Sequence, residues 1–155
     1  MGNAAMRSKR IAKTITAFAV AAGTGLALAS PAAASADPTT SCGDISAHGY
    51  CITLYYNSGK AGSSVSYWGG QRSDFAGDKF LTTGAGKGTA VKNNAASAKY
   101  ISIFSDWGTV YYNSYGDGPC DSIAANHSAS KLVNTYNENA SYYPTNSKPS
   151  GCYAF

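Results

Sequence analysis

The chain has 155 residues, of which 12 are lysine or arginine and 8 are aspartate or glutamate, for a formal net charge of +4. Four of the basic residues lie within residues 7–13, so residues 37–155 carry equal numbers of acidic and basic groups. A net charge of zero gives no support for binding to nucleic acid or to an anionic membrane, and neither is expected as a partner.

Residues 1–36 have the three parts of a secretory signal peptide. A basic segment at residues 7–13 precedes an apolar run at residues 15–29, and Ala34-Ser35-Ala36 supplies an A-x-A cleavage motif. The apolar run is shorter than the roughly 20 residues that a membrane-spanning helix needs. We therefore expect cleavage after Ala36, no stable membrane insertion, and a secreted, extracellular mature protein.

The mature segment, residues 37–155, is predicted to be a single domain of the all-β class. It contains all 12 tyrosines and is rich in glycine, serine and asparagine, which favours strands and tight turns over long helices. Apolar residues that alternate within 52–56, 65–67, 101–103 and 110–112 predict strands. Residues 128–133 are expected to form one short helical turn, and Trp68 and Trp107 are expected in the core.

Four cysteines, all in the mature segment, predict two disulfides, because an exported chain meets an oxidising environment. Four cysteines allow three pairings. We favour Cys42–Cys51 and Cys120–Cys152, since each of these pairs closes a local loop. A zinc site made of the four thiolates is the alternative, but the chain lacks the C-x2-C pair that is typical of such sites.

Two sequence elements occur twice in the mature segment. Residues 55–58, Tyr-Tyr-Asn-Ser, recur at residues 111–114, and residues 93–97, Asn-Asn-Ala-Ala-Ser, recur as Asn-Glu-Asn-Ala-Ser at residues 137–141. The first half is longer between these landmarks, and we assign the extra length to the glycine-rich residues 82–88. The repeat predicts two similar halves of about four strands each, arranged as a Greek-key β-sandwich.

Each half also places a tyrosine six residues before a glycine: Tyr56 before Gly62, and Tyr112 before Gly118. Glycine adopts a positive φ at little cost, and an aromatic ring on the preceding strand can cover such a turn. This spacing resembles the Greek-key signature of the βγ-crystallin superfamily. The resemblance predicts a βγ-crystallin-like Greek-key β-sandwich.

The repeated asparagine-rich element resembles the calcium motif of that superfamily. The resemblance implies weak calcium binding through amide, carboxylate and hydroxyl oxygens, although both copies lack the final serine of the motif. The implied ligands are Asn93, Asn94, Ser97, Asn137, Glu138 and Ser141. The alternative is that the same residues cap turns through their side chains and bind no metal.

Within that superfamily the chain resembles the small secreted bacterial metalloproteinase inhibitors that have a single crystallin-like domain. The resemblance rests on residues 51–56, 90–97, 110–114 and 134–141. It implies a monomeric inhibitor of an extracellular protease, a thermolysin-type metalloprotease, with no cofactor required.

An inhibitor of this kind needs a stiff loop, because stiffness lowers the ordering cost of binding in the protease cleft. Residues 116–123 are the best candidate, since Pro119 fixes its own φ and Cys120 is expected to be tethered by a disulfide. The predicted inhibitory residues are Gly118, Pro119, Cys120, Asp121, Ser122 and Ile123, with Ile123 as an apolar anchor. The alternative is an ordinary disulfide-anchored turn.

No enzymatic activity is expected. The sequence has no H-E-x-x-H, G-x-S-x-G or P-loop pattern, and its two histidines, His48 and His127, stand in unrelated polar contexts. Two further functions stay open at this point: a secreted structural or envelope-associated module, and a crystallin-like antimicrobial toxin.

Overall fold

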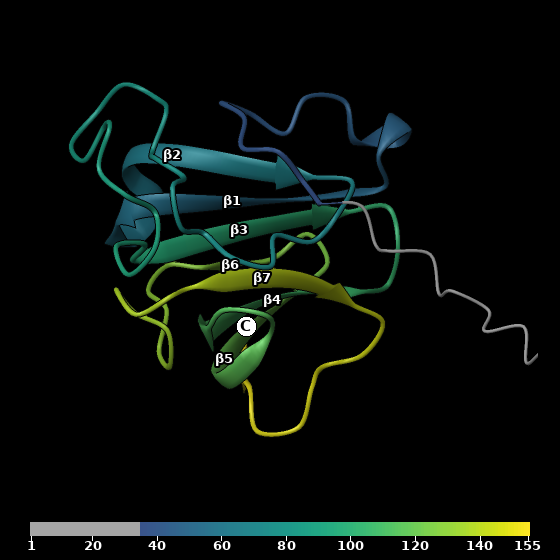
Figure 1. The fold of residues 1–155 in the computed structure, drawn as a ribbon. Helices are drawn as coiled ribbons and strands as arrows, with labels where there is room; N and C mark the ends of the chain where they lie inside the picture. Colours follow the sequence, from purple (N-terminus) through teal and green to yellow (C-terminus); the bar gives the residue numbers. More distant parts are fainter. Residues whose placement is uncertain (1–34) are drawn as a thin grey trace, which may run out of the picture. The chain divides into compact units, whose positions relative to one another are not determined.

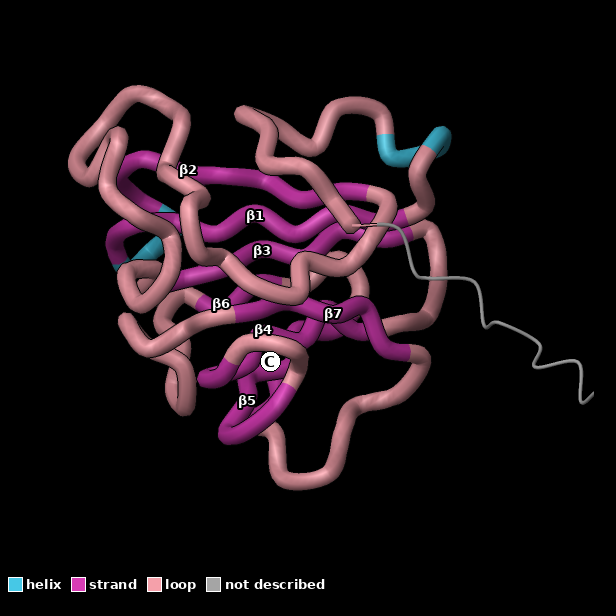
Figure 2. The backbone as a smooth tube through the Cα atoms, in the orientation of Figure 1, coloured by secondary structure: helices cyan, strands magenta, loops and turns pink. Residues whose placement is uncertain are grey.

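The computed structural model describes residues 35–155, and the segment expected to form the signal peptide lies almost entirely outside the described residues. The described chain forms two sheets of four strands each, in which most neighbouring strands run antiparallel (Figure 1). Loops and turns connect the strands, and the longest of them joins β2 to β3 (Figure 2). Within residues 35–155, no helix is long and apolar enough to cross a membrane.

The first sheet has the strand order β2-β1-β3-β6 and the second has the order β7-β4-β5-β8. Two single-turn 3-10 helices, η1 (Ile45–Ala47) and η2 (Ser58–Lys60), are the helical elements of the described chain. The strands are β1 (Tyr50–Asn57), β2 (Ala61–Trp68), β3 (Ser97–Ser102), β4 (Trp107–Asn113), β5 (Asp117–Ala124), β6 (Ser128–Ala129), β7 (Ser141–Thr145) and β8 (Tyr153–Ala154).

The two halves exchange one segment each, which confirms the predicted Greek-key sandwich of two similar halves. β6 follows β5 of the second sheet but pairs with β3 of the first. Conversely, Arg72 follows β2 of the first sheet but pairs with Tyr142 of β7 in the second sheet, through two backbone hydrogen bonds of 2.9 Å. The pairing register also shifts at corresponding places, between Tyr55 and Asn57 and between Tyr111 and Asn113.

Alternation along the strands separates the core from the outer faces. Ile52 and Leu54 of β1 are fully buried, whereas the side chain of Thr53 is only partly buried on the opposite face. The core lies between the sheets, and three of its largest side chains are tyrosines, Tyr67, Tyr100 and Tyr142. The remaining large core side chains are Phe75, Phe80, Ile123, Leu132, Val65, Val91 and Val110.

Two local predictions are wrong. Residues 128–133 contain the short strand β6 and no helical turn, because Ala129 pairs with Ala98 of β3. Trp68 and Trp107 lie outside the core cluster and are half-buried at strand ends. Trp68 instead contacts the ring of His48, with 3.5 Å between ring centroids.

The described fold begins before the predicted cleavage position. Ala36 is only 3% exposed and belongs to the core cluster, and its N–H donates a 2.7 Å hydrogen bond to the carbonyl of Gln71. Ser35 also forms an isolated parallel β-bridge with Gln71. A domain that starts at Asp37 therefore omits a residue that the fold buries.

The favoured cysteine pairing is confirmed. Cys42 is bonded to Cys51 and Cys120 to Cys152, and no free cysteine remains among residues 35–155. The zinc alternative is thereby excluded, because its four thiolates are consumed. One disulfide ties the segment before β1 to that strand, and the other ties β5 to the C-terminal segment.

Candidate functional site

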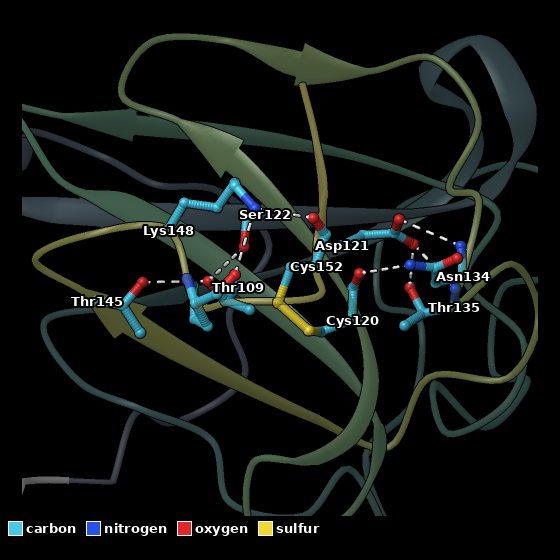
Figure 3. Close-up of a disulfide and its surroundings, with 10 residues drawn as sticks. Thr109, Cys120, Asp121, Ser122, Asn134, Thr135, Thr145, Lys148 and Cys152 are labelled. Atoms are coloured by element: carbon cyan, nitrogen blue, oxygen red, sulfur yellow. Dashed lines mark hydrogen bonds between the residues drawn. A yellow bond between two sulfur atoms is a disulfide. The ribbon is translucent and has the colours of Figure 1, made fainter.

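The segment predicted to be an inhibitory loop is a strand. Residues 118–123 lie in β5, which pairs with β4 on one side and β8 on the other. Figure 3 shows Cys120, Asp121 and Ser122 beside the disulfide to Cys152. Gly118 and Pro119 are exposed, but Asp121, Ser122 and Ile123 are fully buried. Ile123, the expected apolar anchor, belongs to the core. These three side chains cannot reach a protease cleft, so the loop prediction is wrong for them.

The Asp121 side chain instead forms hydrogen bonds that connect β5 to the segment that follows β6. Its carboxylate accepts hydrogen bonds from the N–H groups of Val133 (3.1 Å), Asn134 (3.2 Å) and Thr135 (2.9 Å). A fourth comes from the Thr135 hydroxyl at 2.7 Å. Four hydrogen bonds to a buried carboxylate replace the hydrogen bonds that it loses when it leaves water. Asp121 is therefore a structural residue.

The two serines of the predicted calcium motif are also structural. The Ser97 hydroxyl donates to the carbonyl of Asn57 at 2.6 Å and accepts from the N–H of Lys60 at 3.0 Å. The Ser141 hydroxyl donates to the carbonyl of Asn113 at 2.7 Å and accepts from the N–H of Gly116 at 3.0 Å. Each serine thus closes the bulged hairpin of its own half, and both hydroxyls are already engaged.

The asparagine turns of the two halves contact each other. Asn93 and Asn137 both have positive φ, +62° and +55°, which asparagine tolerates better than most residues. The N–H of Asn93 donates to the carbonyl of Asn139 at 2.7 Å, and the N–H of Asn137 donates to the carbonyl of Ala95 at 3.0 Å. The Asn94 amide donates to the carbonyl of Lys92 at 2.9 Å. These are the side-chain and backbone bonds that capped turns need.

A hollow lies beside both copies of the motif, and a lysine is part of its wall. Lys92, Asn93, Ser114 and Glu138 line it. The Lys92 ammonium donates to the Ser114 hydroxyl at 2.9 Å and forms a 3.0 Å ion pair with Asp74. Partial burial opposes ionisation of Asp74, but the Ala76 N–H and the Lys92 ammonium hold the pKa of its carboxyl below the usual value.

Two of the six predicted ligands are therefore engaged within the protein. The hydroxyls of Ser97 and Ser141 donate to backbone carbonyls, and the Lys92 side chain lines the hollow beside Asn93 and Glu138. Calcium takes six to eight oxygen ligands, and Glu138 is the one carboxylate among the six predicted residues. Among residues 35–155 there is also no group of three or more histidine, cysteine, aspartate or glutamate side chains placed to hold a metal ion.

A feature that the sequence analysis missed lies in the loop between β3 and β4. Ile103 is 58% exposed and Phe104 is 54% exposed, and they are the one adjacent pair among the large exposed apolar residues of the described chain. The alternation of Ile101 and Ile103 had suggested a strand that continues to residue 103. Two consecutive apolar residues, Ile103-Phe104, break the period of two and are the signal that could have located the loop.

Hydrogen bonds with Gly49 and with Asn126 stabilise the conformation of the β3–β4 loop. The N–H of Ile103 donates to the carbonyl of Gly49 at 2.9 Å, and the N–H of Phe104 donates to the Ser102 hydroxyl at 3.0 Å. The Asn126 amide donates to the carbonyl of Ser102 at 3.0 Å and accepts from its N–H at 3.3 Å. An apolar pair is thus presented on a backbone whose conformation is largely fixed.

Gly49 is required for this arrangement. It has φ of +82°, and a Cβ at this position would lie 2.5 Å from the ring of Phe104. The absence of a side chain lets the Phe104 ring approach the backbone that follows η1. One side of the ring is therefore supported while more than half of the side chain stays exposed.

A solved chain from work on the evolution of the eye lens βγ-crystallin domain fold has the same architecture. It matches with a TM-score of 0.53 at 14% sequence identity, over 74% of this chain and 100% of that chain. No model of a protein family and no curated protein matches the sequence. The bulged hairpins, the exchanged segments and this match together show that the described chain has the βγ-crystallin domain fold.

Proposed function

We propose that this protein is a secreted, monomeric inhibitor of an extracellular metalloprotease, and that it binds through the β3–β4 loop. The observation that supports this site is the exposed pair Ile103-Phe104 on a loop held by Gly49 and Asn126. The resemblance of the sequence to secreted metalloproteinase inhibitors supplies the class of partner. The loop replaces residues 118–123 as the candidate inhibitory segment.

The chemistry of the loop suits a thermolysin-type cleft. Such enzymes prefer a large apolar residue directly after the scissile bond, and Ile103 and Phe104 both offer one. Preformed hydrogen bonds to the loop reduce the entropy that is lost on binding, which favours affinity. The same bonds hold the chain ends together after any cleavage, so the cut loop is not released as product.

A direct titration tests the proposal. Residues 35–155 are added to a thermolysin-type metalloprotease and to a serine protease, each at nanomolar concentration. We expect stoichiometric loss of the metalloprotease activity alone. The double variant Ile103→Ser/Phe104→Ser should weaken inhibition by about 100-fold or more, because truncation of the few residues that anchor an interface costs ~2 kcal/mol or more each.

Val133→Ser is the matched control. Val133 is 51% exposed, so the substitution removes an equally accessible apolar side chain from another place on the surface. Inhibition should be unchanged by it. Equal loss from both variants, or no inhibition of either protease at micromolar protein, would refute the proposed site or the proposed function and favour the structural-module alternative.

No catalytic role is included in the proposal. The His48 ring is packed against Trp68, and His127 Nδ1 lies 2.9 Å from the carbonyl of Ala125. Neither histidine has a nucleophile or a carboxylate as its hydrogen-bond partner among the described residues. Hydrolysis of small ester or glycoside substrates by residues 35–155 would contradict this part of the proposal.

A further inference from the structure

Charged residues are unevenly distributed along the described chain. Residues 45–105 contain six basic residues and two acidic ones, whereas residues 106–155 contain two basic residues and four acidic ones. Both acidic residues of the first segment form ion pairs, with Arg72 and with Lys92. The other four basic residues of that segment are lysines, and none of them has an ion-pair partner among the described residues. The first half therefore has an excess of positive charge, although the net charge of residues 37–155 is zero.

Two of these lysines lie near each other on the outer face of the first sheet. Lys99 of β3 is exposed and lies opposite Ser128 of β6 in the antiparallel register, so the two side chains share a face. The Lys60 ammonium donates to the Ser128 hydroxyl at 3.3 Å. No aspartate or glutamate occurs in β1, β2, β3 or β6. This face therefore carries positive charge without a counterion from its own strands.

A hollow of about 220 Å³ opens on the same face. Lys99, Tyr55 and Ile101 line it, together with Cys42 and five serine and threonine residues, and no acidic residue is part of its wall. The hollow is smaller than the sites that take drug-sized ligands, so it suits a single small ring. It combines one ammonium group, several hydroxyls and one aromatic side chain.

The equivalent face of the second sheet is closed. The hydroxyls of Thr53 and Ser66 are 2.9 Å apart, and those of Thr109 and Ser122 in the second half are 3.0 Å apart. Thr109 and Ser122 are fully buried, and the Thr109 hydroxyl has another hydroxyl as its second partner at 3.1 Å. Thr53 is only partly buried, and its second neighbour is Cys42 Sγ at 3.2 Å, a weak acceptor. The first half thus keeps hydrogen-bonding capacity that the second half uses internally.

The lysines of the two faces differ in the same way. Lys148 (Figure 3) donates to the backbone carbonyls of Pro149 at 3.3 Å and Cys152 at 3.1 Å. The Lys99 ammonium takes part in none of the side-chain hydrogen bonds or ion pairs of residues 35–155. Lys99 is therefore free to pair with a ligand, whereas Lys148 has partners in its own loop.

One wall of the hollow is fixed in place. Thr39 and Ser66 exchange two backbone hydrogen bonds of 2.9 Å, so the segment before the hollow runs beside β2. The disulfide between Cys42 and Cys51 ties the end of that segment to β1. Thr40 and Ser41 lie between these two attachments and line the hollow. A wall that is already ordered reduces the entropy lost when a ligand binds.

We propose that this hollow binds an acidic polysaccharide, through one sugar ring that carries a carboxylate. The Lys99 ammonium pairs with the carboxylate, the hydroxyls of Thr40 and Ser41 bond to hydroxyls of the sugar, and Tyr55 packs against its C–H groups. Lys60 pairs with the acidic group of the next sugar in the chain. The site shares no residue with the β3–β4 loop and does not rest on the proposed inhibitory function.

The experiment is a titration of ¹⁵N-labelled residues 35–155 followed by NMR at low ionic strength. The probes are methyl glucuronide, methyl glucoside, which has CH2OH in place of the carboxylate, and acetate, which has the carboxylate without the ring. We expect saturable shifts at the amides of residues 40–42, 53–55 and 99–101 with the glucuronide, in the millimolar range. Methyl glucoside and acetate should bind at least about fivefold more weakly, because each lacks one of the two contacts.

Three variants locate the site. Lys99→Gln, at an exposed position, should weaken glucuronide binding about fivefold and leave glucoside binding unchanged. Tyr55→Leu should weaken the binding of both sugars about threefold or more through loss of the ring. Lys131→Gln is the matched control, because it changes the net charge equally and its ammonium lies 4.7 Å from the ring centroid of Tyr136 instead. It should leave binding unchanged.

A linked trimer of uronic acids tests whether the ligand is a polymer. It should bind at least about threefold more tightly than methyl glucuronide, and Lys60→Gln should remove that gain. Equal affinity of the trimer and the single sugar would refute the assignment to a polysaccharide.

Four other results would overturn the site itself. These are equal affinity for glucuronide and glucoside, acetate that binds as tightly as the glucuronide, equal losses from Lys99→Gln and Lys131→Gln, and no saturation below about 50 mM. Each of them can be obtained whether or not the protein inhibits a protease.

Discussion

The strongest single prediction concerns Asp121, whose carboxylate joins β5 to residues 133–135. Oδ2 accepts three of its four hydrogen bonds, and Oδ1 accepts the one from the Asn134 N–H. In Asp121→Asn, the amide oxygen can replace Oδ2, but the new NH2 group then faces the Asn134 N–H. One bond becomes a contact between two donors, and the other three lose their charge.

The expected cost follows from these contacts. Hydrogen bonds to a charged group contribute about 1.5–3 kcal/mol, and a buried polar group left unpaired costs about 1–3 kcal/mol. We expect Asp121→Asn to lower the free energy of unfolding by about 3 kcal/mol and Asp121→Ala by about 5 kcal/mol, since alanine leaves all four donors unpaired. For a domain of this size, these losses correspond to roughly 10–25 °C in melting temperature.

Urea unfolding of the oxidised protein measures the effect, followed by tyrosine and tryptophan fluorescence. Asp117→Asn is the matched control, because Asp117 is an exposed residue of the same strand with one 3.3 Å bond to Asn113. It should change stability by less than about 0.5 kcal/mol. A loss below about 1 kcal/mol for both Asp121 variants would refute the structural role.

Three further outcomes are expected. Above pH 10, the free energy of unfolding should fall by up to about 4 kcal/mol per pH unit. Burial raises the pKa of Tyr67, Tyr100 and Tyr142, so these three hydroxyls ionise mainly on unfolding. If the absorbance of all three tyrosinates rose near pH 10 while the protein stayed folded, this prediction would be wrong. Calcium at about 5 mM should leave the melting temperature unchanged, since both serine hydroxyls of the predicted sites already donate to backbone carbonyls; a rise of several degrees would show binding. A chain that begins directly after Ala36 should be about 1–2 kcal/mol less stable to urea than residues 35–155, and equal stability would show that the buried Ala36 contributes nothing.

Features that are encoded locally or repeated along the chain could be predicted without a structure. The recurrence of Tyr-Tyr-Asn-Ser and of Asn-x-x-Ala-Ser marks the two bulged hairpins and the serines that close them. The period of two places Ile52 and Leu54 in the core. Short sequence separation selects the cysteine pairing. Each of these depends on residues close in sequence or on a pattern that occurs twice.

The candidate site depends on contacts between residues far apart in sequence. Gly118 and Pro119 suggest a loop, but pairing of β5 with β4 and β8 makes the segment a strand. Lys92 bonds to Ser114 and lines the hollow beside Glu138 because the turn of one half packs beside the hairpin of the other.

The sequence by itself therefore determined the fold class, the two halves and the presence of two disulfides, because these follow from local conformational preferences, from repetition and from the even cysteine count; it favoured one cysteine pairing without fixing it. Only the tertiary structure decided which polar groups have hydrogen-bond partners and which apolar side chains are exposed to solvent. The sequence shows only that residue 121 is an aspartate, and the four donors that the folded chain brings to its buried carboxylate make it a structural residue.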